Sequence, residues 1–387
     1  MKASQTSIVP IKFSSVKDLD SFRNKCIQLD ILSPYDSFSG QFNLRSVKDI
    51  NTNDFSFYYL KNTASEAQCA FRGESVILIV TMLSDFEDYY PFIGSALKSR
   101  AQFVKDTLSC RSSDPYLRRF LLLACQGPLT AKISYVFTFF SIFDPNFSEK
   151  KTIHTKVLAE PSIISSDDML CTELGEQLYN RKTTLDQSIA NKIHDIDLDS
   201  DQWSFITWAS VVTIAKKEDE FVKTHLLTIL IEMRTQYIWN LCFSQSESIE
   251  RLITRHRITS SGTTEAVAES YRILLEAKSS ISATFSSRIS LLHRAIVETS
   301  QLNVITESLE QKINYLISLA DIARKEATKR ATTVSEILLF IVAVAQIFPI
   351  FFEMPLVSQT ITGILSISVL CILGILLIIR KHRNGNV

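Results

Sequence analysis

The sequence predicts an α+β cytoplasmic domain, a very long stalk helix and a C-terminal two-helix transmembrane hairpin, which together form a homo-oligomer. Three observations predict this fold class. Residues 1–160 mix segments of strand composition with segments of helical spacing. Residues 263–348 contain neither Gly nor Pro. The last part of the chain contains two uncharged apolar runs.

The composition excludes several classes of protein. Lys and Arg number 41 and Asp and Glu number 41, so the formal net charge is zero and we expect no direct nucleic-acid partner. Nine Gly and nine Pro are too few for a collagen-like or disordered chain. The seven cysteines are scattered, which favours a reducing compartment over a disulfide framework. The amino-terminal residues lack the apolar core of a secretory signal, so we expect the first domain in the cytoplasm.

Residues 1–160 are expected to form the α/β part of the cytoplasmic domain. Three runs are rich in β-branched and aromatic residues, as strands are. Two other runs have helical spacing and a proline near the first turn. The expected strands are residues 54–60, 75–83 and 132–143, and the expected helices are residues 91–110 and 115–126.

Residues 161–260 are predicted to be a mostly helical cytoplasmic region. The polar run at residues 165–168 (Ser-Ser-Asp-Asp) offers N-cap side chains to a helix that runs towards Arg181. A longer helical run, residues 201–257, contains no Gly or Pro.

Alternating aspartates lie just before that longer run. The candidates for sensing a divalent cation are Asp195, Asp197, Asp199 and Asp201. Their spacing partly matches a calcium-binding loop, but position six is Ser200 rather than Gly and position twelve is Ile206 rather than Glu. The other interpretation, which we favour, is a solvated acidic linker in which Asp201 caps the next helix.

Residues 263–336 are predicted to be the long stalk helix. One apolar stripe runs along it at steps of three or four residues, which is close to the coiled-coil period. The stripe must be buried, either in a helical hairpin within one subunit or in a bundle of several subunits. We favour the bundle because of the apolar runs that follow. The stripe consists of Ile281, Phe285, Ile289, Leu292, Ile296, Leu302, Ile305, Leu309, Ile313 and Leu316.

Residues 337–352 and 361–379 carry no charge and are predicted to be two transmembrane spans. Residues 353–360 leave room only for a tight outer loop, and residues 380–387 form a basic tail. Lys and Arg flank both spans on the side away from the loop, so the positive-inside rule places both chain ends in the cytoplasm. We therefore expect a multi-pass protein of the inner (plasma) membrane. The basic inner ring would consist of Lys329, Arg330, Arg380 and Lys381.

The first span carries small and polar residues near one helical face. Gln346 lies well inside the run, where a polar side chain faces either a partner helix or a water-filled path. Two helices cannot enclose a path, so conduction would require an oligomer. The predicted pore-lining residues are Ser335, Leu339, Val342, Gln346 and Ile350.

The organisation of the chain resembles the CorA family of divalent-cation channels and transporters. Residues 351–356 (Phe-Phe-Glu-Met-Pro-Leu) are similar to the family's outer loop, and residues 380–383 (Arg-Lys-His-Arg) are similar to its basic end. The family's signature is Gly-Met-Asn, whose Asn ring is associated with hydrated Mg²⁺. Here Phe348-Pro349-Ile350 stands in its place, so the outer mouth would consist of Phe348, Pro349 and Glu353. The resemblance implies a homopentamer with the first spans inside.

The expected function is passage of divalent metal cations, Mg²⁺ or a related ion, through an oligomeric pore lined by the first span. The alternative is a CorA-like membrane effector of an antiviral system, of the type III CRISPR kind, gated by a small nucleotide messenger. A third hypothesis is a membrane-anchored scaffold that does not conduct. No motif of an enzyme is present, so we expect no catalytic residues and no cofactor apart from a transported or regulatory cation. The expected partners are other copies of the chain, the lipid bilayer and divalent cations, with a nucleotide messenger in the alternative.

Overall fold

A computed structural model describes residues 1–34, 42, 55–125, 131–133, 135–159, 193–207, 210–254, 260–281 and 287–352. The chain divides into two compact units, which are described separately. The first comprises Met1–Arg257 and Thr264–Leu316, and the second comprises Ile258–Thr263 and Ile317–Val387.

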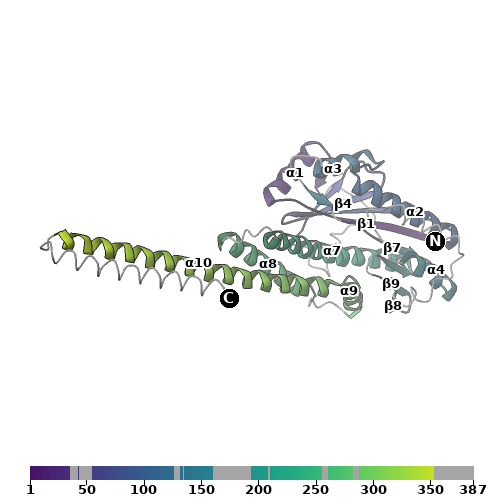
Figure 1. Cartoon of the computed structure of the whole chain (residues 1–387). Helices are drawn as coiled ribbons and strands as arrows, with labels where there is room; N and C mark the ends of the chain where they lie inside the picture. The colour runs from purple at the N-terminus through teal and green to yellow at the C-terminus, as the bar shows by residue number, and fades with distance from the viewer. Residues whose placement is uncertain are drawn as a thin grey trace. The chain divides into compact units, whose positions relative to one another are not determined.

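The first unit is built on one mixed β-sheet with the strand order β2-β3-β4-β5-β1-β7-β10-β9-β8, and β6 pairs with β1 (Figure 1). All neighbours in this order are antiparallel except β7 and β10, which are parallel. The strands are β1 (Lys2–Lys12), β2 (Leu32–Pro34), β3 (Ser56–Leu60), β4 (Glu66–Arg72), β5 (Ser75–Asp85), β6 (Lys132–Ile133), β7 (Phe137–Phe143), β8 (His194–Asp199), β9 (Gln202–Ile206) and β10 (Val211–Ala215).

Strand β1 is central in the sheet. It pairs with β5 along its whole length, from Lys2 opposite Asp85 to Lys12 opposite Ser75, and with β7 on its other side. The sequence analysis did not predict β1, because the run Ser-Gln-Thr-Ser hides the apolar alternation of a strand. Strands pair with both edges of β1 and helices cover both faces of the sheet there, so nearly every residue in β1 is buried, including its hydroxyl side chains.

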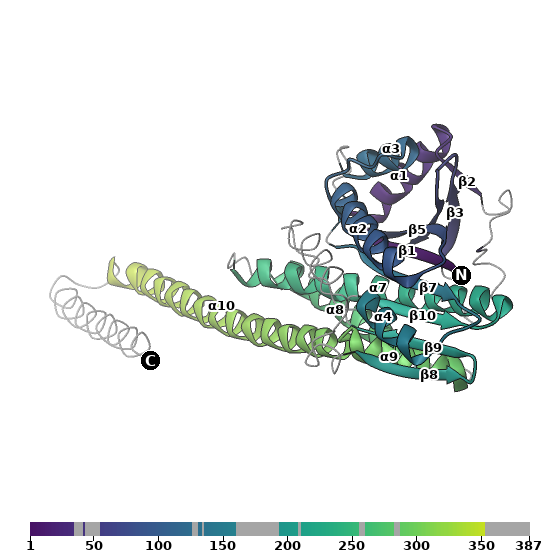
Figure 2. The same cartoon turned by 90° about the vertical axis from the view of Figure 1, so that its right-hand side faces the viewer.

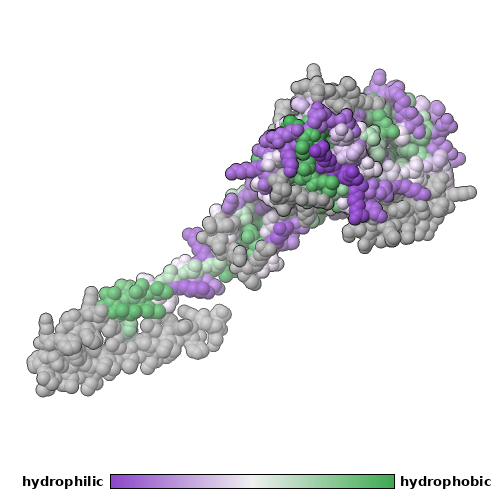
Figure 3. Space-filling model, turned by 90° about the horizontal axis from the view of Figure 1, so that it is seen from above, coloured by the Kyte–Doolittle hydropathy of each residue, from purple (hydrophilic) through white to green (hydrophobic). Residues whose placement is uncertain are grey.

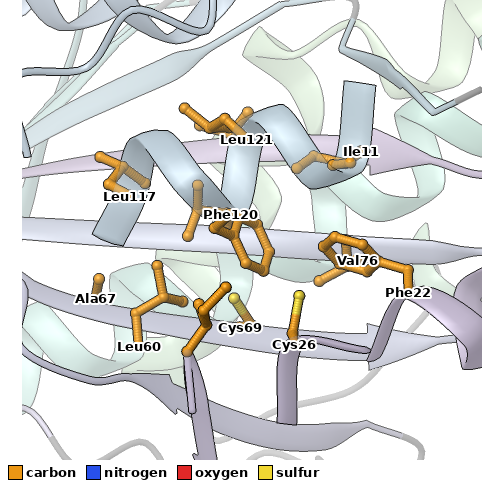
Figure 4. Packing of buried hydrophobic residues seen from close by; sticks show 14 of the residues in the cluster. Ile11, Phe22, Cys26, Leu60, Ala67, Cys69, Val76, Leu117, Phe120 and Leu121 are labelled. Atoms are coloured by element: carbon orange, nitrogen blue, oxygen red, sulfur yellow. The ribbon is translucent and has the colours of Figure 1, made fainter. Parts of the chain in front are cut away.

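One face of the sheet is covered by α1 (Val16–Gln28), α2 (Tyr89–Leu108), α3 (Pro115–Cys125) and α4 (Glu149–Ala159). Figures 1 and 2 show α1, α2 and α3 on the same side of β1 and β5. Beneath α1 and α3, Phe22 packs edge-on against Phe120, with ring centroids 5.1 Å apart, over strand residues such as Val76 (Figure 4). These contacts confirm the α+β part of the predicted fold class, and the expected helices at residues 91–110 and 115–126 are α2 and α3.

The opposite face of the sheet is covered by α7 (Glu218–Thr254), which crosses β10, β7 and β1. Further helices pack around α7: α8 (Ser260–Ile281), α9 (Ser287–Thr299) and the first part of α10 (Leu302–Phe352). Gln245 of α7 donates to the hydroxyl of Ser270 in α8 at 2.7 Å, and Lys312 of α10 donates to the hydroxyl of Ser246 in α7 at 2.6 Å. The helices of the first unit therefore bury one another.

Three strands lie in the region that was predicted to be mostly helical, and β8 occupies the run that was interpreted as an acidic linker. β8, β9 and β10 lie between residues 194 and 215, and α7 begins only at Glu218. Every residue of β10 is buried, because it lies between β7 and β9 within the sheet and between helices on both faces. Short apolar runs of this kind cannot be assigned to helix or strand from periodicity alone. The helix predicted to follow residues 165–168 lies outside the described residues.

The very long stalk helix is a wrong prediction. Residues 263–336 are divided among α8, α9 and α10. The backbone between α9 and α10 turns at Gln301, which has φ 54°, so the left-handed conformation is reached there without a glycine. Seven of the ten residues of the apolar stripe are buried within the same chain, so these need no further subunit; Ile281 and Ile305 are half-buried, and Phe285 lies outside the described residues. The buried members Ile289, Leu292, Ile296, Leu302, Leu309, Ile313 and Leu316 are at most 5 % exposed.

The predicted transmembrane hairpin is also overturned. Within the described part of the chain, no helix is long and apolar enough to cross a membrane. The apolar run at the end of α10 begins at Ile337, and its side chains are described only as far as Ala343. The multi-pass location in the inner membrane depended on this hairpin and is corrected with it. Residues 353–360, 361–379 and 380–387 lie outside the described residues.

Candidate functional site

The second unit presents an exposed apolar surface on α10. Residues 337–343 (Ile-Leu-Leu-Phe-Ile-Val-Ala) form an uninterrupted apolar run, and Figure 3 shows hydrophobic atoms gathered over this part of the helix. Leu339 is 67 % exposed and Leu338 is 57 % exposed. Successive residues of a helix are about 100° apart, so such a run is apolar on all sides. A helix of this kind is normally buried.

An apolar seam leads along α10 into this run. Its residues are three or four positions apart, the spacing of the core positions of a coiled coil. Lys325, Lys329 and Glu336 lie on the opposite face of the helix by the same periodicity. The ion pair between Arg330 and Glu326, at 3.8 Å, is exposed and contributes little. The seam consists of Ala320, Ala323, Ala327, Ala331, Val334, Leu338 and Ile341.

The predicted pore-lining residues all fall within α10. Ser335, Leu339 and Val342 are exposed, and they follow one another by four and three residues, as expected for one helical face. Gln346 and Ile350 lie in the helix, but their side chains are outside the described ones. The pore-lining role of these residues therefore stays a prediction.

The other residues of the predicted channel are only partly described. Lys329 and Arg330 are exposed on α10. Phe348 and Pro349 lie near its end, with side chains outside the described ones. Glu353, Arg380 and Lys381 lie outside the described residues altogether. The predicted outer mouth and basic inner ring thus stay predictions.

The alternating aspartates lie on β8, at the edge of the sheet, and in the turn that follows. Asp195 pairs with Lys156 of α4 at 3.0 Å, and Asp201 pairs with Lys217 at 2.7 Å. Asp201 therefore does not cap a helix that begins beside it. Its ion pair instead joins the turn after β8 to the residue that precedes α7. Charged side chains on an edge strand prevent it from pairing with a strand of another molecule. Among the described residues, no group of three or more His, Cys, Asp or Glu side chains is placed to hold a metal ion.

A buried row of hydroxyl groups lies between the sheet and α7. Ser4, Ser141 and Thr213 are paired in register across β1, β7 and β10, and they face the helix. The hydroxyl of Thr213 donates to Oγ of Ser141 at 2.9 Å. Nδ1 of His225 in α7 is hydrogen-bonded to Oγ of Ser4 at 3.0 Å and to Oγ of Ser141 at 2.8 Å. This imidazole holds α7 in a defined position over three strands.

His225 is fully buried, and its surroundings favour the neutral ring. Its centroid lies 4.1 Å from that of Phe42 and 5.7 Å from that of Phe139, and its Nε2 has no hydrogen-bond partner among the described residues. Burial lowers the pKa of His225 from 6.5 to about 3. The ring therefore stays uncharged in the folded protein at neutral pH.

Glu232 lies two turns further along α7 and is 1 % exposed. Its Oε2 accepts a hydrogen bond from Nε2 of Gln236 at 3.1 Å. Burial raises the pKa of Glu232 from 4.5 to about 8, because a carboxylate loses its hydration there. The nearby carboxyl also helps to raise the pKa of the buried Tyr135, whose hydroxyl donates to the carbonyl of Gln236 at 3.1 Å.

The sequence analysis did not identify the buried hydroxyl row, His225 or Glu232. One available signal was a single His and a single Glu seven residues apart within an otherwise apolar stretch of α7. The hydroxyl row itself depends on the register of strands that are far apart in the chain, so no local pattern indicates it.

Comparisons with known proteins assign no function to these residues. Comparison of the chain with protein-family models, with curated proteins and with solved structures found no match.

Proposed function

We propose that this chain is an assembly protein that associates with copies of itself through α10 and thereby brings several α+β units together. The observation that carries the proposal is the exposed apolar run at residues 337–343, continued by the seam of α10. In this proposal α10 makes the contact between copies, and the α+β unit has no catalytic role.

The physical need for a partner follows from the stability of single helices. An isolated helix in water is marginal even when its sequence favours helix, and most of its stability comes from packing an apolar face. Burying a Leu, Ile or Val side chain contributes about 1.5–3 kcal/mol. Val334, Leu338 and Ile341 from each of two copies would thus contribute roughly 9–18 kcal/mol before the cost of association, which is about 4–15 kcal/mol. A pair of copies is therefore of modest stability, and additional copies strengthen the assembly.

Several copies of α10 fit this surface better than one covering segment. A single neighbouring helix covers only one side of α10, whereas residues 337–343 are apolar on every side. Alanines at four positions of the seam allow two helices to approach closely before the larger side chains meet. Identical helices also carry these small and large positions in the same order, which suits knobs-into-holes packing.

The predictions of divalent-cation passage and of gating by a nucleotide messenger stay untested. Both were framed for a protein that crosses a membrane, so they form no part of this proposal.

The proposal is tested by the mass of the full-length chain in solution, measured by light scattering after gel filtration and by sedimentation. We expect the wild type to exceed one chain mass and to approach it on dilution. The double variant Leu338→Glu/Ile341→Glu should be a monomer at the same concentration, because two charges would enter each packed seam. The control is Thr332→Glu on the opposite face, which should assemble like the wild type.

Two results would contradict the proposal. One is a wild-type chain that is monomeric throughout the accessible concentration range. The other is a double variant that assembles as well as the wild type, which would place the contact elsewhere. If α10 instead associates with phospholipid vesicles and leaves the chain monomeric in solution, self-assembly is equally rejected.

A further inference from the structure

The seam of α10 continues a helical face that the first unit buries. Leu309, Ile313 and Leu316 belong to the first unit and are 0 % exposed. From Leu316 onwards the seam follows with the same steps of three or four residues, so it lies on the same face of the helix. Leu338, further along this face, is 57 % exposed. The face is therefore open to another copy of the chain only beyond Leu316.

Charge is distributed unevenly along the open part of α10. Residues 321–330 contain six charged side chains, whereas residues 337–343 contain none. If the apolar run packed against the charged part of another copy, it would remove water from those charges, which costs free energy. If it packs against the same run of another copy, the charges stay in water. The match of apolar run to apolar run requires helices that are parallel and in register.

An antiparallel pair is obstructed by the chain itself. When two seams are laid over each other in opposite directions, Ile341 lies opposite Ala320. Residues 342–352 of one helix would then continue alongside residues 309–319 of the other, since α10 extends to Phe352. Within that stretch the seam face is already buried in the first unit, as Leu316 shows. In a parallel pair, residues 342–352 instead lie alongside their counterparts.

The spacing of the seam suits long parallel contact. Ala320 and Ala331 are 11 residues apart, and so are Ala327 and Leu338. Eleven residues occupy three turns at about 3.67 residues per turn, which is close to the value of about 3.6 for a straight α-helix. Copies of α10 can therefore keep the seam in contact with little supercoiling.

We propose that copies of α10 associate in parallel and in register, so that each seam residue meets the same residue of a neighbouring copy. This arrangement rests on the self-assembly proposed above and gives it a direction. The part of α10 up to Leu316 belongs to the first unit, so the first units of all copies join the bundle at the same end.

The test introduces one thiol into the seam of the full-length chain. Ala323→Cys is treated with a short bis-maleimide crosslinker, and the tryptic peptides are mapped. We expect residues 313–324 to be joined to a second copy of the same peptide, which can come only from another chain. In an antiparallel pair, position 323 would face Leu338, and the two introduced thiols would be about 22 Å apart along the helices. Native cysteines lie in other peptides, so links through them are recognised.

Two matched variants distinguish contact in the seam from random reaction. Lys325→Cys places the thiol on the opposite face of α10, so its peptide, residues 325–329, should not be joined to itself. Combining Ala323→Cys with Leu338→Glu/Ile341→Glu should reduce the joined product to the level of that control, because the charges prevent assembly.

Failure of the parallel geometry and failure of self-assembly give different results. A wild-type chain that is monomeric by light scattering contradicts both. The parallel geometry alone is overturned by an assembled chain in which Ala323→Cys does not join itself but joins Leu338→Cys in a mixture of the two variants. An assembled chain that forms neither link overturns it as well.

Discussion

The variant Glu232→Gln is expected to be more stable than the wild type by about 4 kcal/mol at pH 7.5, and nearly equal to it at pH 4.5. The reason is the cost of ionising a carboxyl between α7 and the sheet. Glu232 is 1 % exposed, and Gln236 is the residue that donates a hydrogen bond to its carboxyl. A glutamine of the same shape keeps that position uncharged at every pH.

The sign of this effect follows from the direction of the pKa shift. Burial raises the pKa of Glu232 from 4.5 to about 8 in the folded protein, so the folded chain holds its proton more tightly than the unfolded chain does. The stability that this group contributes is complete below about pH 4.5. It is lost at about 1.4 kcal/mol per pH unit as the pH rises towards 8.

Chemical denaturation at a series of pH values measures this prediction. The difference in unfolding free energy between Glu232→Gln and the wild type should grow steadily from pH 4.5 to pH 8 and then level off. Glu307→Gln is the matched control, because this glutamate is exposed on α10 and keeps its water in the folded chain. A difference that stays constant with pH would show that folding leaves the pKa of Glu232 unchanged, and it would contradict the prediction.

The variant His225→Gln is expected to remove a loss of stability that the wild type suffers in acid, about 3 kcal/mol at pH 4.5. Burial lowers the pKa of His225 from 6.5 to about 3, so the folded chain holds the proton less tightly than the unfolded chain. The stability that depends on the neutral ring is complete above about pH 6.5. It is lost as the pH falls towards 3.

Among the residues that the structure describes, no acidic side chain is paired with His225 to offset this cost. The ring lies among Phe42, Phe139 and Phe221, and its Nδ1 is hydrogen-bonded to serine hydroxyls. A proton on Nε2 would therefore enter a site without an acceptor among the described residues. A glutamine at this position can still exchange hydrogen bonds with Ser4 and Ser141, but it does not ionise.

The measurement is the slope of unfolding free energy against pH, not its absolute value, since the substitution also changes packing. Between about pH 4.5 and 6.5 the contributions of His225 and Glu232 have opposite slopes and cancel in the wild type. Each single variant should therefore uncover the slope of the other group in that window. The control His194→Gln, at an exposed position of β8, should follow the wild type. If His225→Gln and the wild type have parallel profiles, the proposed charge cost is rejected.

Local patterns were informative where neighbouring residues decide the structure. The prolines that begin residues 91–110 and 115–126, together with the helical spacing of these runs, indicated α2 and α3, and the apolar run at residues 75–83 indicated β5. The exposed apolar run of α10 was also visible in the sequence, because it depends only on composition and order. Its assignment to a membrane span was wrong, because no described helix is long and apolar enough to cross a membrane.

Contacts between distant segments decided the rest. The absence of Gly and Pro from residues 263–348 suggested one rod, yet Gln301 turns the backbone, and α9, which carries part of the apolar stripe, packs against α7, β8 and β9 within the same unit. An apolar stripe indicates that one face of a helix must be buried, but it does not indicate which element covers that face. For the same reason, β9 and β10 were mistaken for helix, because the pairing of β10 with the distant strand β7 is not visible in local sequence.

The sequence by itself determined that this protein combines an α+β unit with an apolar carboxyl-terminal helix, because composition and spacing are properties of the chain alone. Only the tertiary structure decided that Ser4 and Ser141 meet His225, that Thr213 meets Ser141, and that Glu232 is buried. Strand register and helix packing bring these groups together across many residues of intervening chain. The removal of water from them then sets their charge and reactivity.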